Sequence, residues 1–212
     1  MIIQFKGEEL LLCKERAIYW AAKKMLIISD LHIGKASFFR KQGIQVPLNI
    51  SNTDLQNLTL LLETYPTDVL LITGDMFHNY MNQEVEDFGL WRARYPQLNI
   101  QLIKGNHDGL KPIDYQKLNI TTFEKELLNH PFRFIHDQPI ANEDQYYSLT
   151  GHIHPGITIF GKARQRLRFP CFYFGKSFAI LPAFSLFTGI SMVKPQEGDR
   201  IFAITPGSVV EV

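Results

Sequence analysis

The stretch MLIISDLH, residues 25–32, decides how the fold is interpreted, because a compact apolar run ends abruptly at Asp30 and His32. A short continuous apolar run is typical of a strand that is buried on both faces. In open α/β sheets, binding sites form outside the carboxyl ends of the strands. The stretch therefore predicts a buried strand that delivers an aspartate and a histidine to a site at its end.

Four further apolar runs end in the same way. The runs are DVLLIT (68–73), NIQLIK (99–104), RFI (133–135) and YYSLT (146–150). The polar residues that follow them are Asp75, then Asn106, His107 and Asp108, then His136, then His152 and His154. A lone Asp-x-His or His-x-His pair is common by chance, whereas an ordered set of five polar segments is not.

The chemistry of this set indicates a metal site. Carboxylate and imidazole groups with an amide oxygen, and without a thiolate, suit divalent ions such as Mn²⁺, Fe²⁺ or Zn²⁺. In Asp30-x-His32 and His152-x-His154 the members are two positions apart, and on an extended segment such residues point to the same side. A glycine precedes three of the polar segments, which lets the backbone turn sharply and approach closely.

The order of the predicted elements indicates an α/β fold. Leucines at helical spacing in SNTDLQNLTLLLETYP (51–66) and the segment QEVEDFGLWRARY (83–95) predict two helices between the first three buried strands. This alternation implies a parallel or mixed sheet covered by helices. Residues beyond 130 instead read as strands joined by turns, which can close as two sheets packed face to face with helices outside. With 212 residues and no repeat or linker, we expect a single domain, residues 1–212.

Composition and charge exclude several classes of protein. Hydrophobic residues make up 45% of the chain and charged residues 20%, as in ordinary globular proteins. The net charge of +1 argues against a surface that grips nucleic acid over its whole extent, but leaves room for a local basic patch. No apolar stretch approaches the ~20 residues that span a bilayer, and Glu8 and Glu9 stand where a signal peptide needs apolar residues. Cys13 and Cys171 match no metal or disulfide spacing, so we expect a cytoplasmic protein without membrane contact.

A run of alternating cations lies in GKARQRLRF, residues 161–169. On a strand, Lys162, Arg164, Arg166 and Arg168 would share one face, which could follow the phosphates of a nucleic acid. A solvated edge strand, on which cations deter aggregation, explains the same pattern equally well. The sequence leaves both interpretations open.

Other residues near the predicted strand ends could bind a substrate. Lys35 and Arg40 follow the first polar segment closely and would add positive charge beside the site. His78, three residues after the second aspartate, could line a substrate pocket or play a structural role. Phe38 and Phe39 are expected in the core rather than as platforms for base stacking.

The ordered polar segments resemble the motifs of the calcineurin-like metallophosphoesterases. The matching residues are Asp30-x-His32, Gly74-Asp75, Gly105-Asn106-His107-Asp108, His136 and Gly151-His152-x-His154. The resemblance implies that family's four-layer αββα sandwich, in which two mixed β-sheets are flanked by helices. It also implies a phosphoesterase that uses two divalent metal ions, with Mn²⁺ favoured and Fe or Zn as alternatives.

The resemblance also assigns ligands. One ion would be held by Asp30, His32, Asp75 and His154, and the other by Asp75, Asn106, His136 and His152. Two ions roughly 3.5–4 Å apart can clamp the attacking and leaving oxygens of an in-line displacement, with a hydroxide between them as the nucleophile.

Two further residues of the third polar segment are the predicted catalytic residues. His107 follows a ligand directly, and imidazoles in general have a pKa near working pH, so this residue would protonate the leaving oxygen. Asp108 would orient or charge that ring, as carboxylates do in other catalytic pairs. A turn cap before Gly109 is an equally good role for Asp108.

A narrower resemblance, to one bacterial branch of the family, the ligase-associated DNA damage response endonucleases, covers nearly the whole chain. The segments that carry it are SDLHIGKASFFRKQGIQVP (29–47), GDMFHN (74–79), RFPCF (168–172) and LPAFSLFTG (181–189). The resemblance implies a DNA endonuclease acting in repair, with DNA as a partner and a DNA ligase or helicase as further partners; a dimer is left open. The alternatives are a phosphoesterase for a small nucleotide or sugar nucleotide, and a non-catalytic scaffold, which the complete ligand set disfavours.

Overall fold

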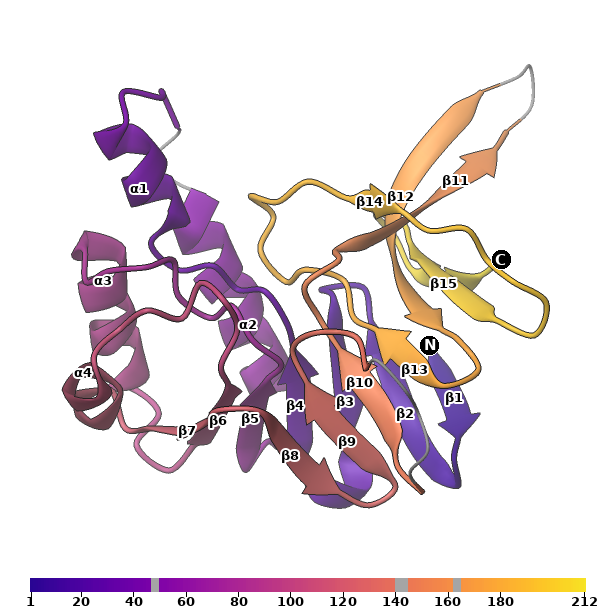
Figure 1. Cartoon of the computed structure of the whole chain (residues 1–212), viewed down its shortest axis with the longest axis horizontal. Helices are drawn as coiled ribbons and strands as arrows, with labels where there is room; N and C mark the ends of the chain where they lie inside the picture. The colour runs from indigo at the N-terminus through magenta and orange to yellow at the C-terminus, as the bar shows by residue number, and fades with distance from the viewer. Residues whose placement is uncertain (47–49, 140–144, 162–164) are drawn as a thin grey trace.

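Two β-sheets pack face to face in the computed structural model, and the helices lie on the side of the first sheet (Figure 1). The structure describes residues 1–46, 50–139, 145–161 and 165–212, with the backbone only at positions 50–52. Among these residues, no helix has the length and apolar character that crossing a bilayer requires.

The first sheet contains seven strands in the order of the chain. They are β1 (Ile2–Phe5), β2 (Glu8–Cys13), β3 (Ala17–Trp20), β4 (Met25–Ile28), β5 (Val69–Ile72), β6 (Asn99–Ile103) and β7 (Ile120–Phe123), with a 3₁₀ turn, η1 (Ala21–Lys23), between β3 and β4. Strands β1 to β4 pair antiparallel, and β4 to β7 pair parallel. The carboxyl ends of β4, β5 and β6 therefore meet at one edge of the sheet.

Each parallel crossover of the first sheet carries a helix. Helices α1 (Lys35–Lys41) and α2 (Ile50–Thr64) connect β4 to β5, α3 (Gln83–Arg92) connects β5 to β6, and α4 (Pro112–Lys117) connects β6 to β7. Leu58 of α2 and Phe88 of α3 are fully buried in one apolar core with Leu70 and Ile100 of the sheet. This core fixes the strand ends relative to one another.

The second sheet contains nine strands. They are β8 (Glu126–Asn129), β9 (Phe132–Ile135), β10 (Tyr147–Thr150), β11 (Pro155–Phe160), β12 (Arg166–Phe174), β13 (Phe178–Ile180), β14 (Ser191–Met192), β15 (Arg200–Ile204) and β16 (Val209–Glu211). Strand β10 pairs parallel with β9 and β13, β11 pairs parallel with the short β14, and the remaining pairs are antiparallel. The sheet is therefore mixed, like the first.

Apolar side chains from both sheets fill the space between them. Trp20 and Ile27 of the first sheet share a buried cluster with Phe132, Leu149 and Phe202 of the second. The rings of Trp20 and Phe132 meet edge to face, with centroids 5.1 Å apart. Packing of this kind sets the distance between the two sheets, and thus between residues at their edges.

The predicted sandwich of two mixed sheets is confirmed. Helices on the outer side of the second sheet are not found in the described part of the chain. The connections explain this difference, because the crossover from β10 to β13 consists of the β11–β12 hairpin instead of a helix. In Figure 1 this hairpin, which belongs to the second sheet, extends beyond the other strands of that sheet.

Candidate active site

Five of the predicted metal ligands share a strained backbone conformation. Asp30 and His32 follow β4 with φ angles of 53° and 51°, and Asp75 follows β5 with φ of 49°. His152 and His154, which follow β10, have φ angles of 67° and 53°. Residues other than glycine rarely adopt this left-handed region, and such strain concentrates at functional sites. The strain marks the edge of the sandwich where these strands end.

Asp30, His32 and His154 form a first cluster, in which each residue offers a ligand atom within 4.8 Å of the others. Nε2 of His154 lies 3.1 Å from Oδ1 of Asp30, and Nε2 of His32 lies 4.0 Å from the same oxygen. Oδ1 of Asp30 and both ring nitrogens of His32 are buried and have no hydrogen-bond partner among the described residues. Buried polar atoms are costly when unpaired. The cluster therefore fits a divalent cation, which would satisfy these atoms.

Asp75, His136 and His152 form a second cluster of the same spread. Nε2 of His136 lies 3.5 Å from Oδ2 of Asp75 and 3.2 Å from Nδ1 of His152. Oδ1 of Asn106 lies 3.3 Å from Nε2 of His136. The other ring nitrogen of His136 lies 2.9 Å from the carbonyl oxygen of Thr73, the kind of contact that fixes a metal-binding histidine in one orientation. This set also fits a divalent cation.

The two clusters adjoin across the two sheets. The N–H of His152, which follows β10, donates a hydrogen bond of 3.1 Å to Oδ2 of Asp30, which follows β4. Ser29 donates a further hydrogen bond of 2.5 Å to the same oxygen through its Oγ. A Cβ at Gly151 would overlap this hydroxyl, so only glycine allows the approach.

Burial and neighbouring charges set the protonation states in the clusters. Burial, with the charge of Lys35, lowers the pKa of His32 to about 3, so its ring is neutral and keeps a lone pair for a cation. Burial alone would raise the pKa of Asp75, but the hydrogen bond and charge of His136 lower it to about 2. Burial alone would lower the pKa of His136, but the contact with Asp75 raises it to about 9. A cation at the second cluster would therefore displace a proton from His136.

His107 lies beside both clusters. Its ring stacks on that of His78, with centroids 4.7 Å apart and an interplanar angle of 23°, and its centroid is 5.6 Å from that of His32. The backbone N–H of His107 donates a hydrogen bond of 2.9 Å to Oδ1 of Asp75. These contacts hold His107 next to the clusters. The residue is half-buried, so its imidazole still reaches solvent.

Asp108 has a different position from that expected of a catalytic partner. Its Oδ1 accepts the N–H of Phe77 at 2.8 Å, and its Oδ2 accepts the N–H of Gly105 at 2.9 Å. Burial raises the pKa of this carboxyl to about 7. Among the described residues, its carboxylate makes no hydrogen bond to the His107 ring. The geometry therefore favours the turn-capping role and gives no support to the predicted role in orienting His107.

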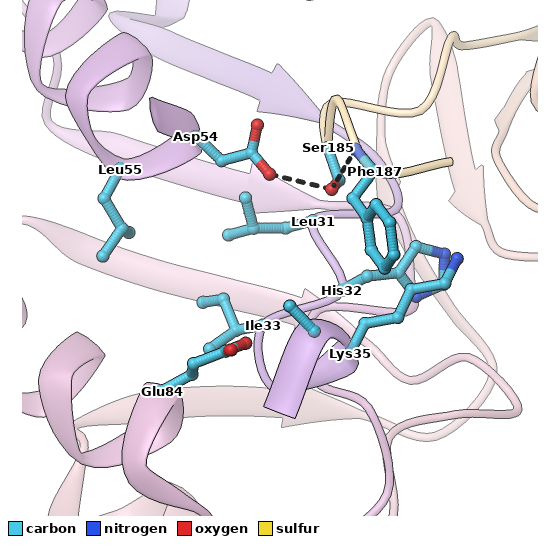
Figure 2. A pocket seen from close by; sticks show the side chains of 10 residues that line it. Leu31, His32, Ile33, Lys35, Asp54, Leu55, Glu84, Ser185 and Phe187 are labelled. Carbon is cyan, nitrogen blue, oxygen red and sulfur yellow. Dashed lines mark hydrogen bonds between the residues drawn. The ribbon is translucent and has the colours of Figure 1, made fainter. Parts of the chain in front are cut away.

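Two of the predicted substrate-binding residues lie at the clusters. Lys35 lines a narrow pocket together with His32 (Figure 2), and its pKa is lowered by burial, against the raising effect of Asp30 and Asp75. His78 is buried, and its ring centroid lies 4.9 Å from that of Phe38.

Arg40 has a structural contact, and Phe38 and Phe39 differ from their expected place in the core. The Arg40 guanidinium donates to Oε1 of the buried Glu84 at 2.5 Å, and Glu84 also accepts the N–H of Gly34 at the start of α1. Arg40 thus ties α1 to α3, and its use in substrate binding stays a prediction. Phe38 and Phe39 are half-buried beside His78 instead of fully inside the core.

The two described arginines of the predicted basic stripe do not lie at the clusters. Arg166 and Arg168 are exposed on β12, in the part of the strand that belongs to the projecting hairpin. Lys162 and Arg164 lie outside the described residues. Arg166 and Arg168 therefore belong to a separate surface from the site.

A segment that hydrogen-bonds to the backbone of Asp30 was not predicted from the sequence to play this role. The segment LPAFSLFTG (181–189) runs alongside the chain after β4, where the N–H of Phe184 donates to the carbonyl of Ser29. The N–H of Ser185 donates to the carbonyl of Asp30 at 3.2 Å. This segment therefore holds the backbone of a predicted ligand.

Two charged residues hold that segment in place. The carboxylate of Asp54, buried on α2, accepts the hydroxyl of Ser185 at 2.8 Å (Figure 2) and the N–H of Leu186 at 3.0 Å. Arg16 donates to the carbonyls of Ala183 and Ser185 at 3.1 and 3.0 Å. Asp54 and Ser185 are 131 positions apart, so no local pattern could have revealed the contact.

The solved structures include a close match over the whole chain. The crystal structure of the nuclease MPE from Pseudomonas putida is 29% identical, covers 100% of this chain and 99% of its own, and superposes with a TM-score of 0.85. A protein of unknown function, AQ665 from Aquifex aeolicus, is 20% identical over 61% of this chain and 78% of its own, with a TM-score of 0.42, too low to carry an argument. No curated protein matches the chain in sequence.

The family comparison agrees with the geometry of the site. The model of the calcineurin-like phosphoesterases matches residues 23–200, a range that contains every predicted metal ligand and His107. The similarity to a nuclease of the same architecture is consistent with the ligase-associated endonuclease branch. This chain belongs to the calcineurin-like phosphoesterase family and is a metal-dependent phosphoesterase.

Proposed function

We propose that this chain is a binuclear phosphodiesterase that cuts DNA in the course of repair. The observation that carries the proposal is the pair of adjoining clusters, Asp30, His32 and His154 beside Asp75, His136 and His152, joined by the hydrogen bond from His152 to Asp30. Two cation sites side by side are the arrangement that phosphoester hydrolysis uses. The similarity to a nuclease supports a nucleic-acid substrate.

The donor atoms of the site fit two divalent ions. In the proposal, Asn106 would join the second cluster through its amide oxygen and Asp75 would contribute to both sites, with Mn²⁺ as the ion that this thiolate-free set favours. When bound, the ions supply charge stabilisation for the phosphoryl oxygens and lower the pKa of water. Asn106 adds no negative charge, which suits a residue beside a phosphate.

The residues around the clusters have separate tasks in this proposal. The His107 ring, held by its stack on His78 and by its backbone hydrogen bond to Asp75, protonates the leaving oxygen. The ammonium group of Lys35 attracts the anionic phosphodiester to the pocket edge. Neither task requires Asp108, whose oxygens are occupied by backbone N–H groups.

The cellular part of the proposal rests on the family resemblance. Both cysteines are free and buried, which suits a reducing cytoplasm. A DNA ligase or helicase as a protein partner, and a dimer as the assembly, stay predictions.

Nicking of supercoiled plasmid tests the proposal directly. We expect the protein loaded with Mn²⁺ to convert supercoiled plasmid to the open-circular form, and Asp75→Asn to abolish this activity. Asp68→Asn is the matched control, since Asp68 is a carboxylate whose side chain is 70% exposed in an ion pair with Lys24. Nicking should fall steeply as salt rises, because phosphate contacts dominate nucleic-acid affinity.

Two results would replace the proposal by an alternative. Hydrolysis of bis-p-nitrophenyl phosphate without nicking would exclude DNA and favour a small nucleotide or sugar nucleotide as substrate. Absence of hydrolysis with Mn²⁺, Fe²⁺ and Zn²⁺ alike would exclude an enzyme and favour a scaffold.

A further inference from the structure

A two-stranded arm extends from the first cluster. The arm comprises β11 and the paired part of β12, residues 155–160 and 166–170. Strand β11 begins at Pro155, directly after the predicted ligand His154. In Figure 1 the arm rises at the upper right, beyond the other strands of the second sheet. Its root is thus at the predicted metal centre while its end is far from it.

The register of the arm separates its side chains onto two faces. Arg168 pairs with Thr158, and Arg166 pairs with Phe160. Cross-strand partners, and residues two apart on one strand, share a face of a sheet. One face therefore carries Thr158, Phe160, Arg166 and Arg168, and the other carries Ile157, Ile159, Leu167 and Phe169.

The cations of the first face are exposed and unpaired. Among the described residues, neither Arg166 nor Arg168 forms an ion pair with a carboxylate. The Arg166 guanidinium lies 5.7 Å from the ring centroid of Phe160, whose exposed fraction is 71%. Exposed guanidinium groups beside an exposed aromatic ring are suited to a nucleic-acid strand, since one binds phosphates and the other stacks on bases.

We propose that the cationic face of the arm binds the phosphodiester backbone of a nucleic-acid strand whose scissile phosphate lies at the metal clusters. The inference rests on the proposed function and adds a second contact several nucleotides away from the cut. It commits to a polymeric substrate, because a mononucleotide at the clusters cannot reach the arginines.

The geometry of a strand gives the spacing of this contact. With a rise of about 3.3 Å per residue, Arg168, opposite Thr158, is about 13 Å along the arm from His154. Arg166, opposite Phe160, is about 20 Å away. Successive phosphates of one duplex strand advance about 3.4 Å along the axis, so these distances correspond to about four and six nucleotides.

A double variant that neutralises two arginines separates the contribution of the arm from that of the catalytic site. Arg166→Gln/Arg168→Gln removes two exposed cations from the arm. The control Lys117→Gln/Lys125→Gln removes two exposed cations from α4 and from the turn between β7 and β8. Fluorescence anisotropy in EDTA measures the binding of labelled single-stranded DNA, duplex DNA and RNA from two to sixteen nucleotides long. Hydrolysis of bis-p-nitrophenyl phosphate with Mn²⁺ reports on the clusters separately.

The arm variant should lose roughly tenfold in affinity for at least one type of sixteen-nucleotide strand, and its logarithmic salt slope should fall by about two. Affinity for dinucleotides and the rate on bis-p-nitrophenyl phosphate should match those of the wild type. Affinity and salt slope equal to those of the control variant would overturn the proposal. The arginines would then be cations that deter aggregation of an edge strand. An altered sedimentation mass with unaltered nucleic-acid affinity would also overturn the proposal, and would make the arm an interface between protein chains.

The same measurements separate failure of the arm from failure of the proposed function. Length-dependent binding that requires the arginines, with no cleavage by the wild type, contradicts DNA cleavage and supports the arm as a nucleic-acid surface. Cleavage by wild type and arm variant with the same dependence on strand length contradicts the arm and supports the proposed function.

Discussion

Gly105 lies so close to Asp75 that a side chain at position 105 would displace it. A Cβ there would lie 2.6 Å from the backbone nitrogen of Asp75 and 2.8 Å from Nε2 of His136, and would overlap Oδ1 of Asp75. The glycine after β6 therefore allows two strand ends to approach within the second cluster. Its absence of a side chain is a requirement of the site rather than of the turn alone.

We expect Gly105→Ala to weaken metal binding and to destabilise the fold. The added methyl has to push Asp75 or His136 aside, at a cost of about 1–3 kcal/mol in the free energy of unfolding. Titration calorimetry with Mn²⁺ and urea unfolding measure the two effects. Gly189→Ala is the matched control, because nothing lies within 4 Å of a Cβ at that position. Equal metal affinity in both variants would show that the second cluster does not need this approach.

Metal loading should stabilise the protein through the first cluster. A ligand that binds the native state at 100 times its Kd adds about 2.7 kcal/mol to the free energy of unfolding, or roughly 5–10 °C in Tm for a chain of this size. We expect Mn²⁺ to produce such a shift in EDTA-washed wild type and in Asp68→Asn, and most of it to disappear in Asp30→Asn. Thermal scans with and without Mn²⁺ decide the matter, and an undiminished shift in Asp30→Asn would remove Asp30 from the ligand set.

His107→Asn should lose catalysis while keeping metal. The ring stacks on His78 and is absent from both clusters of ligand atoms, so we expect unchanged Mn²⁺ affinity. Loss of a general acid costs about 10²–10⁴-fold in kcat for an alkyl leaving group and much less for p-nitrophenolate, which needs no proton. Steady-state kinetics on the two kinds of phosphodiester provide the comparison. Equal losses on both would contradict the proton-donor role.

Asp54 should make stability depend on pH. Burial raises the pKa of this carboxyl to about 6, against the opposing effects of Leu186, Ser185 and Arg16. Because the folded pKa lies above the unfolded one, the stabilisation is complete below pH ~4 and is lost as pH rises to ~6. Asp54→Asn cannot ionise, so its stability relative to wild type should rise between pH 4 and 7 by up to about 3 kcal/mol. Urea midpoints across this range measure the difference, and parallel profiles for the two proteins would refute the assignment.

Local patterns were sufficient for the strands that end in the polar segments, whereas β7, β8, β14 and β16 were not predicted. The apolar runs at 25–29, 68–73 and 99–104 correspond to β4, β5 and β6, because a strand buried on both faces needs continuous apolar residues. Helices α1 and α4 escaped prediction, since 7 and 6 residues are too few to show a helical period. The arm was visible only as alternating cations, a pattern that does not show how far it extends beyond the other strands of its sheet.

What the sequence by itself determined is therefore the order of strands and the polar residues that end them, because periodicity and strand-end chemistry are local properties. Only the tertiary structure decided that Asp30 meets His152, that Asp108 caps a turn and that Asp54 holds Ser185. These contacts depend on how the second sheet packs on the first through residues such as Trp20 and Phe132. Packing between distant segments is set by the shape of the whole core, which no stretch of the sequence contains on its own.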